Sequence, residues 1–148
     1  MGMRFVGLQV PQGAKITKAY LEFEVDEADS EQTSLIIEGE DADSSAGFQS
    51  ASGNVSGRPR TTERATWAPG GWGTVGQGQQ TPDLSKVVEE IVQRPGWAPG
   101  NAITLIVRGS GKRTAVSYNG KAGGAPLLHV EYDASKPGKP TGYRVEDE

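Results

Sequence analysis

Four carboxylates at the end of a strand-like segment have the types and spacing to bind a hard cation. The segment 33–40 (TSLIIEGE) leads into this acidic run, whose members are Glu38, Glu40, Asp41 and Asp43. Ca²⁺ prefers six to eight oxygen ligands from carboxylates and loop carbonyls, and a preceding strand fixes the backbone of such a site. The run matches neither an EF-hand loop nor a nonapeptide repeat, so a solvated acidic turn is the alternative. We expect a structural calcium ion as the candidate cofactor, held by these four residues.

Aromatic side chains in the loops suit the binding of a sugar ring. Trp72 lies in the glycine-rich loop 68–80 (APGGWGTVGQGQQ), and we expect it to be the most exposed tryptophan. Tyr118, in SYNGKAGG, is the next candidate for a stacking surface. Aromatic faces pack against the C–H faces of pyranose rings, while polar groups at the edges fix the orientation. Trp67 ends a predicted strand, and Trp97 follows the end of a predicted helix. We therefore expect both to pack that helix onto a sheet.

Two arginines flank the turn formed by residues 109–112 (GSGK). Arg108 and Arg113 can donate hydrogen bonds to hydroxyl or carboxylate groups of a ligand. Salt bridges with Glu131 would explain both arginines equally well. The turn itself predicts a tight hairpin between the strands on either side.

The chain offers no recognisable catalytic set. His129 is the only histidine, and cysteine is absent, so a Ser–His–Asp or Cys–His arrangement would depend on this one imidazole. Alternation in LLHVEY places His129 on the face opposite Leu128 and Val130, which favours a partly exposed cross-strand residue. No GxSxG, HExxH or P-loop motif occurs. We therefore predict a noncatalytic protein.

One segment has the period of an amphipathic helix, at about 82–94. Its apolar residues fall at i, i+3, i+4, i+7 and i+8: Leu84, Val87, Val88, Ile91 and Val92. Thr81 can cap the start, Pro82 suits the first helical position, and Pro95 ends the pattern. A single short helix cannot bury its stripe alone, so we expect it to lie on a β-sheet.

The rest of the chain alternates or is rich in turn residues. Strands are expected at 3–10, 15–25, 33–40, 63–67, 102–109, 113–119 and 126–133. Short strands at this spacing with one helix predict an all-β fold, a jelly-roll-type β-sandwich. We assign residues 1–133 to this module. Residues 134–148 form a Pro/Gly/Lys linker followed by a candidate extra strand at 141–146.

Composition excludes several classes of partner. The net charge of −4 and a pI of about 5.1 argue against nucleic-acid binding, which needs a basic face. No apolar run approaches the ~20 residues of a membrane helix, so membrane insertion is not expected. The lack of cysteine excludes disulfides and leaves the compartment open.

Two long phrases resemble known modules. They are VGLQVPQGAKITKAYLEFEVDEADSEQTSLIIEGEDAD and TPDLSKVVEEIVQRPGWAPGNAITLIVRGSGKRTAVSYNGKAGGAPLLHVEY. They are similar to the DNRLRE-type, carbohydrate-binding-module-like β-sandwich modules of secreted bacterial multidomain proteins, over roughly residues 3–132. The resemblance implies an extracellular, noncatalytic module of a larger bacterial exoprotein, with a polysaccharide or other glycan as its partner. It does not identify the glycan.

The two ends of the chain depart from those modules. The modules have a further strand before the segment equivalent to MRFVG, whereas this chain continues beyond LHVEY into GYRVEDE. The segment PGKPTGYRV resembles the start of a fibronectin-type-III-like domain. Alternatively, a strand at 141–146 can fill the vacancy in its own molecule or in a neighbour. The second outcome predicts self-association through an edge strand, and with it a structural or adhesive stalk or filament subunit as the alternative function.

Overall fold

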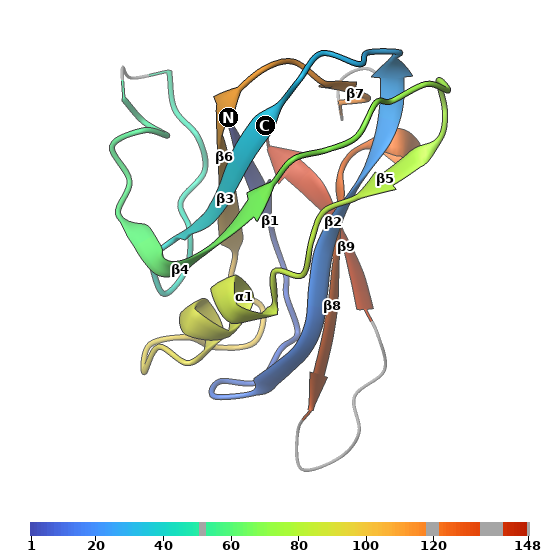
Figure 1. Ribbon diagram of the computed structural model, residues 1–148. Helices are drawn as coiled ribbons and strands as arrows, with labels where there is room; N and C mark the ends of the chain where they lie inside the picture. The colour runs from blue at the N-terminus through green and yellow to red at the C-terminus, as the bar shows by residue number, and fades with distance from the viewer. Residues whose placement is uncertain (51–52, 118–121, 134–140, 148) are drawn as a thin grey trace.

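The computed structural model describes residues 1–50, 53–117, 122–133 and 141–147, and it contains two antiparallel sheets that enclose one core. The elements in chain order are β1 (Gly2–Phe5), β2 (Lys15–Glu27), β3 (Ser34–Glu40), β4 (Arg60–Trp67), β5 (Gly78–Gln80), α1 (Ser85–Val92), β6 (Ile103–Ser110), β7 (Thr114–Ala115), a 3₁₀ turn (Ala122–Gly124), β8 (Leu127–Asp133) and β9 (Thr141–Asp147). One sheet has the order β4-β3-β6-β1, and the other has the order β8-β2-β5 (Figure 1). The predicted all-β sandwich with one short helix is confirmed.

β9 joins the two sheets along one side. Its first half pairs with β8, where Thr141 lies opposite Val130. Its second half pairs with β1, where Val145 lies opposite Phe5. A strand that passes from one sheet to the other in this way makes a corner of the sandwich. The predicted strand at 141–146 is present, and in this structure it pairs within its own chain.

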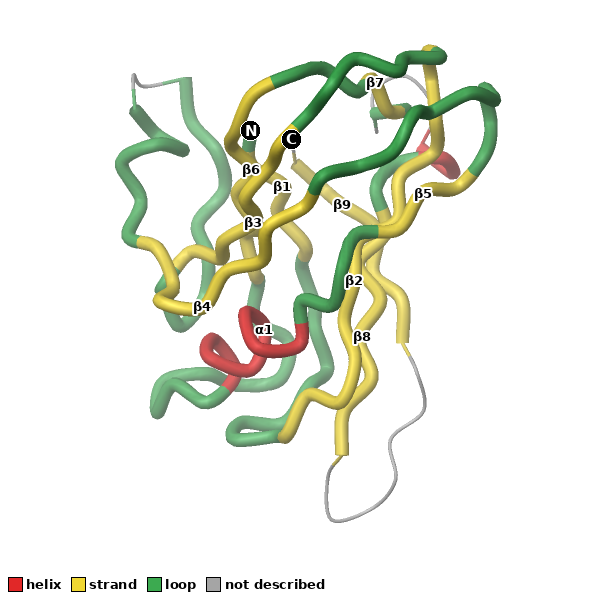
Figure 2. The backbone as a smooth tube through the Cα atoms, viewed as in Figure 1, coloured by secondary structure: helices red, strands yellow, loops and turns green. Residues whose placement is uncertain are grey.

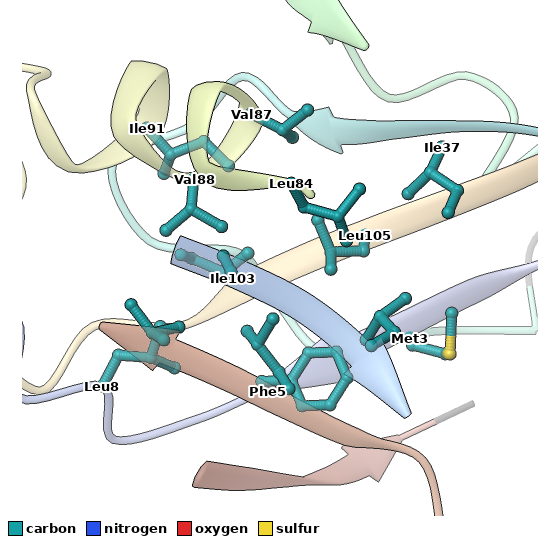
Figure 3. Packing of buried hydrophobic residues seen from close by; sticks show 14 of the residues in the cluster. Met3, Phe5, Leu8, Ile37, Leu84, Val87, Val88, Ile91, Ile103 and Leu105 are labelled. Atoms are coloured by element: carbon teal, nitrogen blue, oxygen red, sulfur yellow. The ribbon is translucent and has the colours of Figure 1, made fainter. Parts of the chain in front are cut away.

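The helix closes the space between the sheets at one end of the molecule. α1 contacts β2 of one sheet and β3 and β4 of the other. All the predicted stripe residues are at most 1% exposed: Leu84, Val87, Val88, Ile91 and Val92. Figure 3 shows Leu84, Val88 and Ile91 directed toward the side chains of Ile103 and Leu105 on β6. The stripe therefore predicted both the helix and the face that it buries.

The helix begins three residues later than the predicted range 82–94. Residues 81–84 run alongside β2 instead: the Thr81 amide donates to Leu21 O (2.9 Å), and the Leu84 amide donates to Ala19 O (2.6 Å). The Thr81 hydroxyl accepts a hydrogen bond from the Leu21 amide (3.0 Å), so it does not cap α1. The prediction that Thr81 caps the helix was therefore wrong, because hydrogen bonds with β2 engage the Thr81 hydroxyl and the amides of Thr81 and Leu84.

Two adjacent glutamates of α1 accept hydrogen bonds from backbone amides of both sheets. Glu89 accepts a hydrogen bond from the Ile16 amide of β2 (3.1 Å). Glu90 accepts hydrogen bonds from the Thr62 and Glu63 amides of β4 (2.8 and 2.9 Å). Unpaired edge amides attract other strands, and side chains that cover them block such pairing. The helix therefore links the two sheets through polar contacts as well as through its apolar stripe.

The predicted hairpin at 109–112 does not form. β6 pairs with β3 and β1, whereas β7 pairs with β2 of the other sheet. The connection between them passes very close to β3: a Cβ on Gly109, whose φ is +147°, would lie 2.1 Å from Ser34 O. Gly109 therefore allows a close approach to β3 rather than a two-strand turn. The strand β5, in the predicted glycine-rich loop, was not anticipated.

A long loop covers the outer face of the first sheet beside β1 and β6. Figure 2 shows it as a loop standing next to β3 and β4, between Glu40 and Arg60. A Cβ on Gly2 of β1 would lie 3.0 Å from Val55 of this loop, so the two are in contact. Arg58 fixes the loop by donating hydrogen bonds to its backbone carbonyls, those of Ala46, Gly47 and Asn54.

Candidate functional site

A cavity of about 250 Å³ lies between the sheets at the end opposite α1. Both sheets contribute to it: Phe23 of β2 and Ala115 of β7 on one side, Leu35, Trp67 and Val107 on the other. Its remaining lining residues are Met1, Trp72, Arg113, Thr114, Val116 and Pro126. We call this space the end cavity. It brings together Trp72 and Arg113, two of the predicted ligand-binding residues.

Three aromatic rings form one wall of the end cavity. Phe23 and Trp67 are stacked, with ring centroids 6.0 Å apart and planes inclined by 12°. Trp72 lies 6.3 Å from each of them, with its plane tilted by 34° and 45° respectively. Such offset and tilted arrangements are favourable for aromatic rings. Trp67 therefore belongs to this end, and the prediction that it packs the helix was wrong. Trp97, in contrast, is buried near the helix end and donates its indole N–H to Val10 O (2.8 Å).

The expectation that Trp72 is exposed was wrong. The residue is 3% exposed, because its loop is fastened to the turn after β2. The Trp72 amide donates to Asp29 O (2.8 Å), and the Asp29 amide donates to Trp72 O (2.9 Å). The glycine-rich sequence is compatible with a loose loop or with one tied down by Trp72, and this long-range pair corresponds to the second. Trp72 is therefore a buried residue that lines the end cavity.

Arg113 is a structural centre of the loops around the end cavity. Its side chain is 5% exposed, and it donates hydrogen bonds to the carbonyl oxygens of Glu31 (2.6 Å), Pro69 (3.2 Å) and Gly70 (3.1 Å). It also donates to the Thr33 hydroxyl (2.9 Å). The guanidinium thus ties together three chain segments, and most of its donors are already used. It lines the cavity but is better suited to holding the wall than to recognising a ligand.

Arg108 lies away from the end cavity. It alternates with Val107 on β6, so it faces outward from the first sheet, and its side chain is 48% exposed. Its Nε donates to Glu38 Oε1 (2.8 Å), and Arg60 contacts the same oxygen (3.2 Å). The hydrogen bond from Arg108 and the charges of both arginines lower the pKa of Glu38, although burial opposes them. Glu131, the alternative partner proposed for the arginines, binds His129 instead (2.9 Å).

The structure does not bring the four predicted calcium ligands to one point. Glu38 is held by two arginines, and Glu40 Oε1 is held by Arg58 (3.1 Å). Asp41 and Asp43 both bind the guanidinium of Arg94, at 2.5 and 2.8 Å. Glu40 Oε2 is buried without a hydrogen-bond partner in the described part of the chain, but one oxygen falls far short of a calcium shell. As the structure places them, these residues do not fit a calcium ion.

An aromatic pair on the outer face of the second sheet was only partly anticipated. Tyr20 of β2 and His129 of β8 lie directly opposite each other, with ring centroids 4.7 Å apart and planes inclined by 16°. The Lys18 ammonium lies 5.5 Å from the Tyr20 centroid. This confirms His129 as a partly exposed cross-strand residue. Because the two rings stack on each other, the faces in contact are not available to stack on a sugar ring.

The sequence identified part of the end cavity and missed the rest. Tyr118, the second predicted stacking residue, lies outside the described residues. Phe23, Leu35 and Val107 lie in predicted strands, where alternation cannot distinguish a side chain that lines a cavity from one that fills the core. The aromatic content of β2 and β4 was the one usable signal.

Comparison with known proteins finds no matching family model, no matching curated protein and no matching solved structure. The resemblance to DNRLRE-type modules therefore stays a prediction that rests on the residues alone.

Proposed function

We propose that this chain is a noncatalytic carbohydrate-binding module of a larger extracellular bacterial protein, with the end cavity as its ligand site. The observation that carries the proposal is the aromatic wall of this cavity. Aromatic rings with a few polar groups at the edge are the usual means of holding a sugar ring. The aromatic rings of Trp67, Trp72 and Phe23 supply that wall, and Thr114 supplies a hydroxyl.

The lining also favours binding over catalysis. In the part of the chain that the structure describes, the eleven lining residues include no carboxylate side chain and no imidazole, and their one charged side chain is that of Arg113, which is bound to backbone carbonyls. General acid–base or nucleophilic chemistry needs a group that can exchange a proton near neutral pH. Among the described residues, no helix has the length and apolar character to cross a bilayer.

A glycan array followed by calorimetry on the best ligand tests the proposal. Trp67→Ala should weaken binding by tenfold or more, since a desolvated aromatic anchor is typically worth about 2 kcal/mol. Tyr20→Ala is the matched control, because it removes an aromatic ring from the outer face of the other sheet and should leave affinity unchanged. Loss of binding in Tyr20→Ala but not in Trp67→Ala would move the site to that face.

The alternative function is a structural subunit that donates a strand. The observation that favours it is the position of β9, which supplies pairing to both β1 and β8. The same pairing supplied by a neighbour would link successive modules head to tail. Deletion of residues 134–148 separates the outcomes. Lost stability with an unchanged oligomeric state indicates that the strand pairs in its own chain. Loss of a polymer indicates donation to a neighbour, and no change in either property assigns the segment to a linker.

A further inference from the structure

We infer that the end cavity takes a single ring poor in hydroxyl groups, at the end of a glycan chain: an aryl substituent or a deoxygenated or O-alkylated terminal sugar. The inference rests on the proposed function, because it names the kind of ring that the same cavity accepts. Three features carry it, namely the volume of the cavity, the polarity of its lining and the way its wall is held.

The volume fits one ring. An apolar cavity of roughly 150 Å³ is enough for benzene, whereas pockets for drug-sized ligands begin at about 300 Å³. The end cavity, at about 250 Å³, lies between these sizes. It also lies between the two sheets, with Phe23, Leu35 and Val107 from the core in its lining. A ring at the end of a chain can enter such a space, whereas an internal sugar of a polymer needs an exit on each side.

The lining offers few hydrogen bonds. Most of its surface comes from aromatic and aliphatic side chains. Arg113 has already committed donors to Glu31, Gly70 and other acceptors. Among the lining residues that the structure describes, the remaining polar side-chain groups are the Thr114 hydroxyl and the indole N–H groups of the two tryptophans. A fully hydroxylated hexopyranose brings more hydroxyls than these can satisfy, and each unpaired buried hydroxyl weakens binding.

Contacts within the chain hold the wall in place. The Asp29–Trp72 backbone pair fixes the indole, and Arg113 fixes the loop that precedes it through Pro69 and Gly70. Asp29 also lies 3.8 Å from the Arg113 guanidinium. A wall anchored at this many points cannot easily refold to present polar backbone groups to a ligand. The preference for an apolar ring is therefore a property of the folded state.

The test compares phenol, phenyl β-D-glucopyranoside and methyl β-D-glucopyranoside as probes. Binding is followed by NMR through the three indole N–H resonances, which are assigned with single Trp→Phe variants. Phenol and the phenyl glucoside should shift the resonances of Trp67 and Trp72, with dissociation constants at least tenfold below that of the methyl glucoside. The resonance of Trp97, at the helix end, should not move, which makes it an internal control.

Ala115→Leu fills the cavity and should abolish these shifts while the Trp97 resonance keeps its position. If Ala115→Leu does not fold, the flexible side chain of Ala115→Met serves the same purpose. Equal affinity for methyl and phenyl glucosides would overturn the inference and leave the proposed function standing. Binding of phenol with no glycan on the array would support the ring preference and overturn the carbohydrate assignment. No shift with any probe would overturn the inference outright.

Discussion

The two ends of this sandwich are closed in different ways. At one end, α1 and the residue before it place five apolar side chains between the sheets, and Glu89 and Glu90 bind backbone amides of both sheets. At the other end, loops tied together by Arg113 surround a space of about 250 Å³ that an aromatic wall lines. At the helix end, apolar side chains fill the space between the sheets. At the other end, hydrogen bonds from Arg113 hold loops around a space that is not filled. This difference is the physical basis for proposing a ligand site at the second end.

The same substitution at both ends should show the difference most strongly. Leu84→Ala, in the fully packed helix end, should cost about 3–5 kcal/mol because the surrounding sheets cannot collapse into the new void. Leu35 lines the end cavity, and Leu35→Ala merely enlarges an existing space. This substitution should therefore lower the free energy of unfolding by about 1–2 kcal/mol. Urea unfolding of the two variants measures both. Equal losses would mean that the two ends are equally well packed.

The polar link at the helix end should have a smaller but measurable effect. Glu90→Ala removes the acceptor of two amides of β4, and it should lower stability by about 1–2 kcal/mol. Lys86→Ala is the control on the same helix, because the Lys86 side chain is 73% exposed and forms only a 3.9 Å contact with Glu89. Dimer formation by Glu90→Ala in size-exclusion chromatography would indicate that Glu90 also protects the β4 edge.

The helix end should also be sensitive to acid. Burial raises the pKa of Asp83, but hydrogen bonds from the Ser85 side chain and from the Ala19 and Ser85 amides outweigh it, so the pKa lies below its ordinary value. A depressed folded-state pKa contributes stability above the unfolded-state value of about 4, and this contribution is lost as pH falls through the folded-state pKa. Asp83→Asn should therefore flatten the loss of melting temperature below about pH 4. If the melting temperature of Asp83→Asn falls with pH as steeply as that of the wild type, Asp83 is not a source of the acid sensitivity.

The smallest effect is expected for calcium. Because Arg58, Arg60, Arg94 and Arg108 hold the carboxylates of the acidic run, melting temperatures in calcium and in a chelator should agree. A bound ion would stabilise the fold by about 2.7 kcal/mol at a hundredfold excess over its dissociation constant. A shift of that size would show that the arginines give way to the ion.

The sequence predicted the packed end better than the open one. The 3.6-residue period of the stripe alone identified α1 and its buried face, since every stripe position is decided by local spacing. The start of α1 was wrong because pairing of Thr81 and Leu84 with β2 is not visible in local capping signals. The prediction that Trp72 is exposed was wrong for the same reason, because its burial depends on backbone pairing with Asp29, far away in the chain. Arg113 binds Glu31, 82 residues away, and no spacing rule reveals such a contact.

The most direct test of the account is the location of xenon in crystals of this domain under xenon pressure. Xenon enters apolar cavities that are already present in the folded protein. The account predicts one strong site in the end cavity, among Phe23, Trp67 and Trp72, and none between α1 and the sheets. An end cavity without xenon, or equal occupancy beneath Leu84 and Ile91, would contradict the claim that one end is packed and the other is built to receive a ligand.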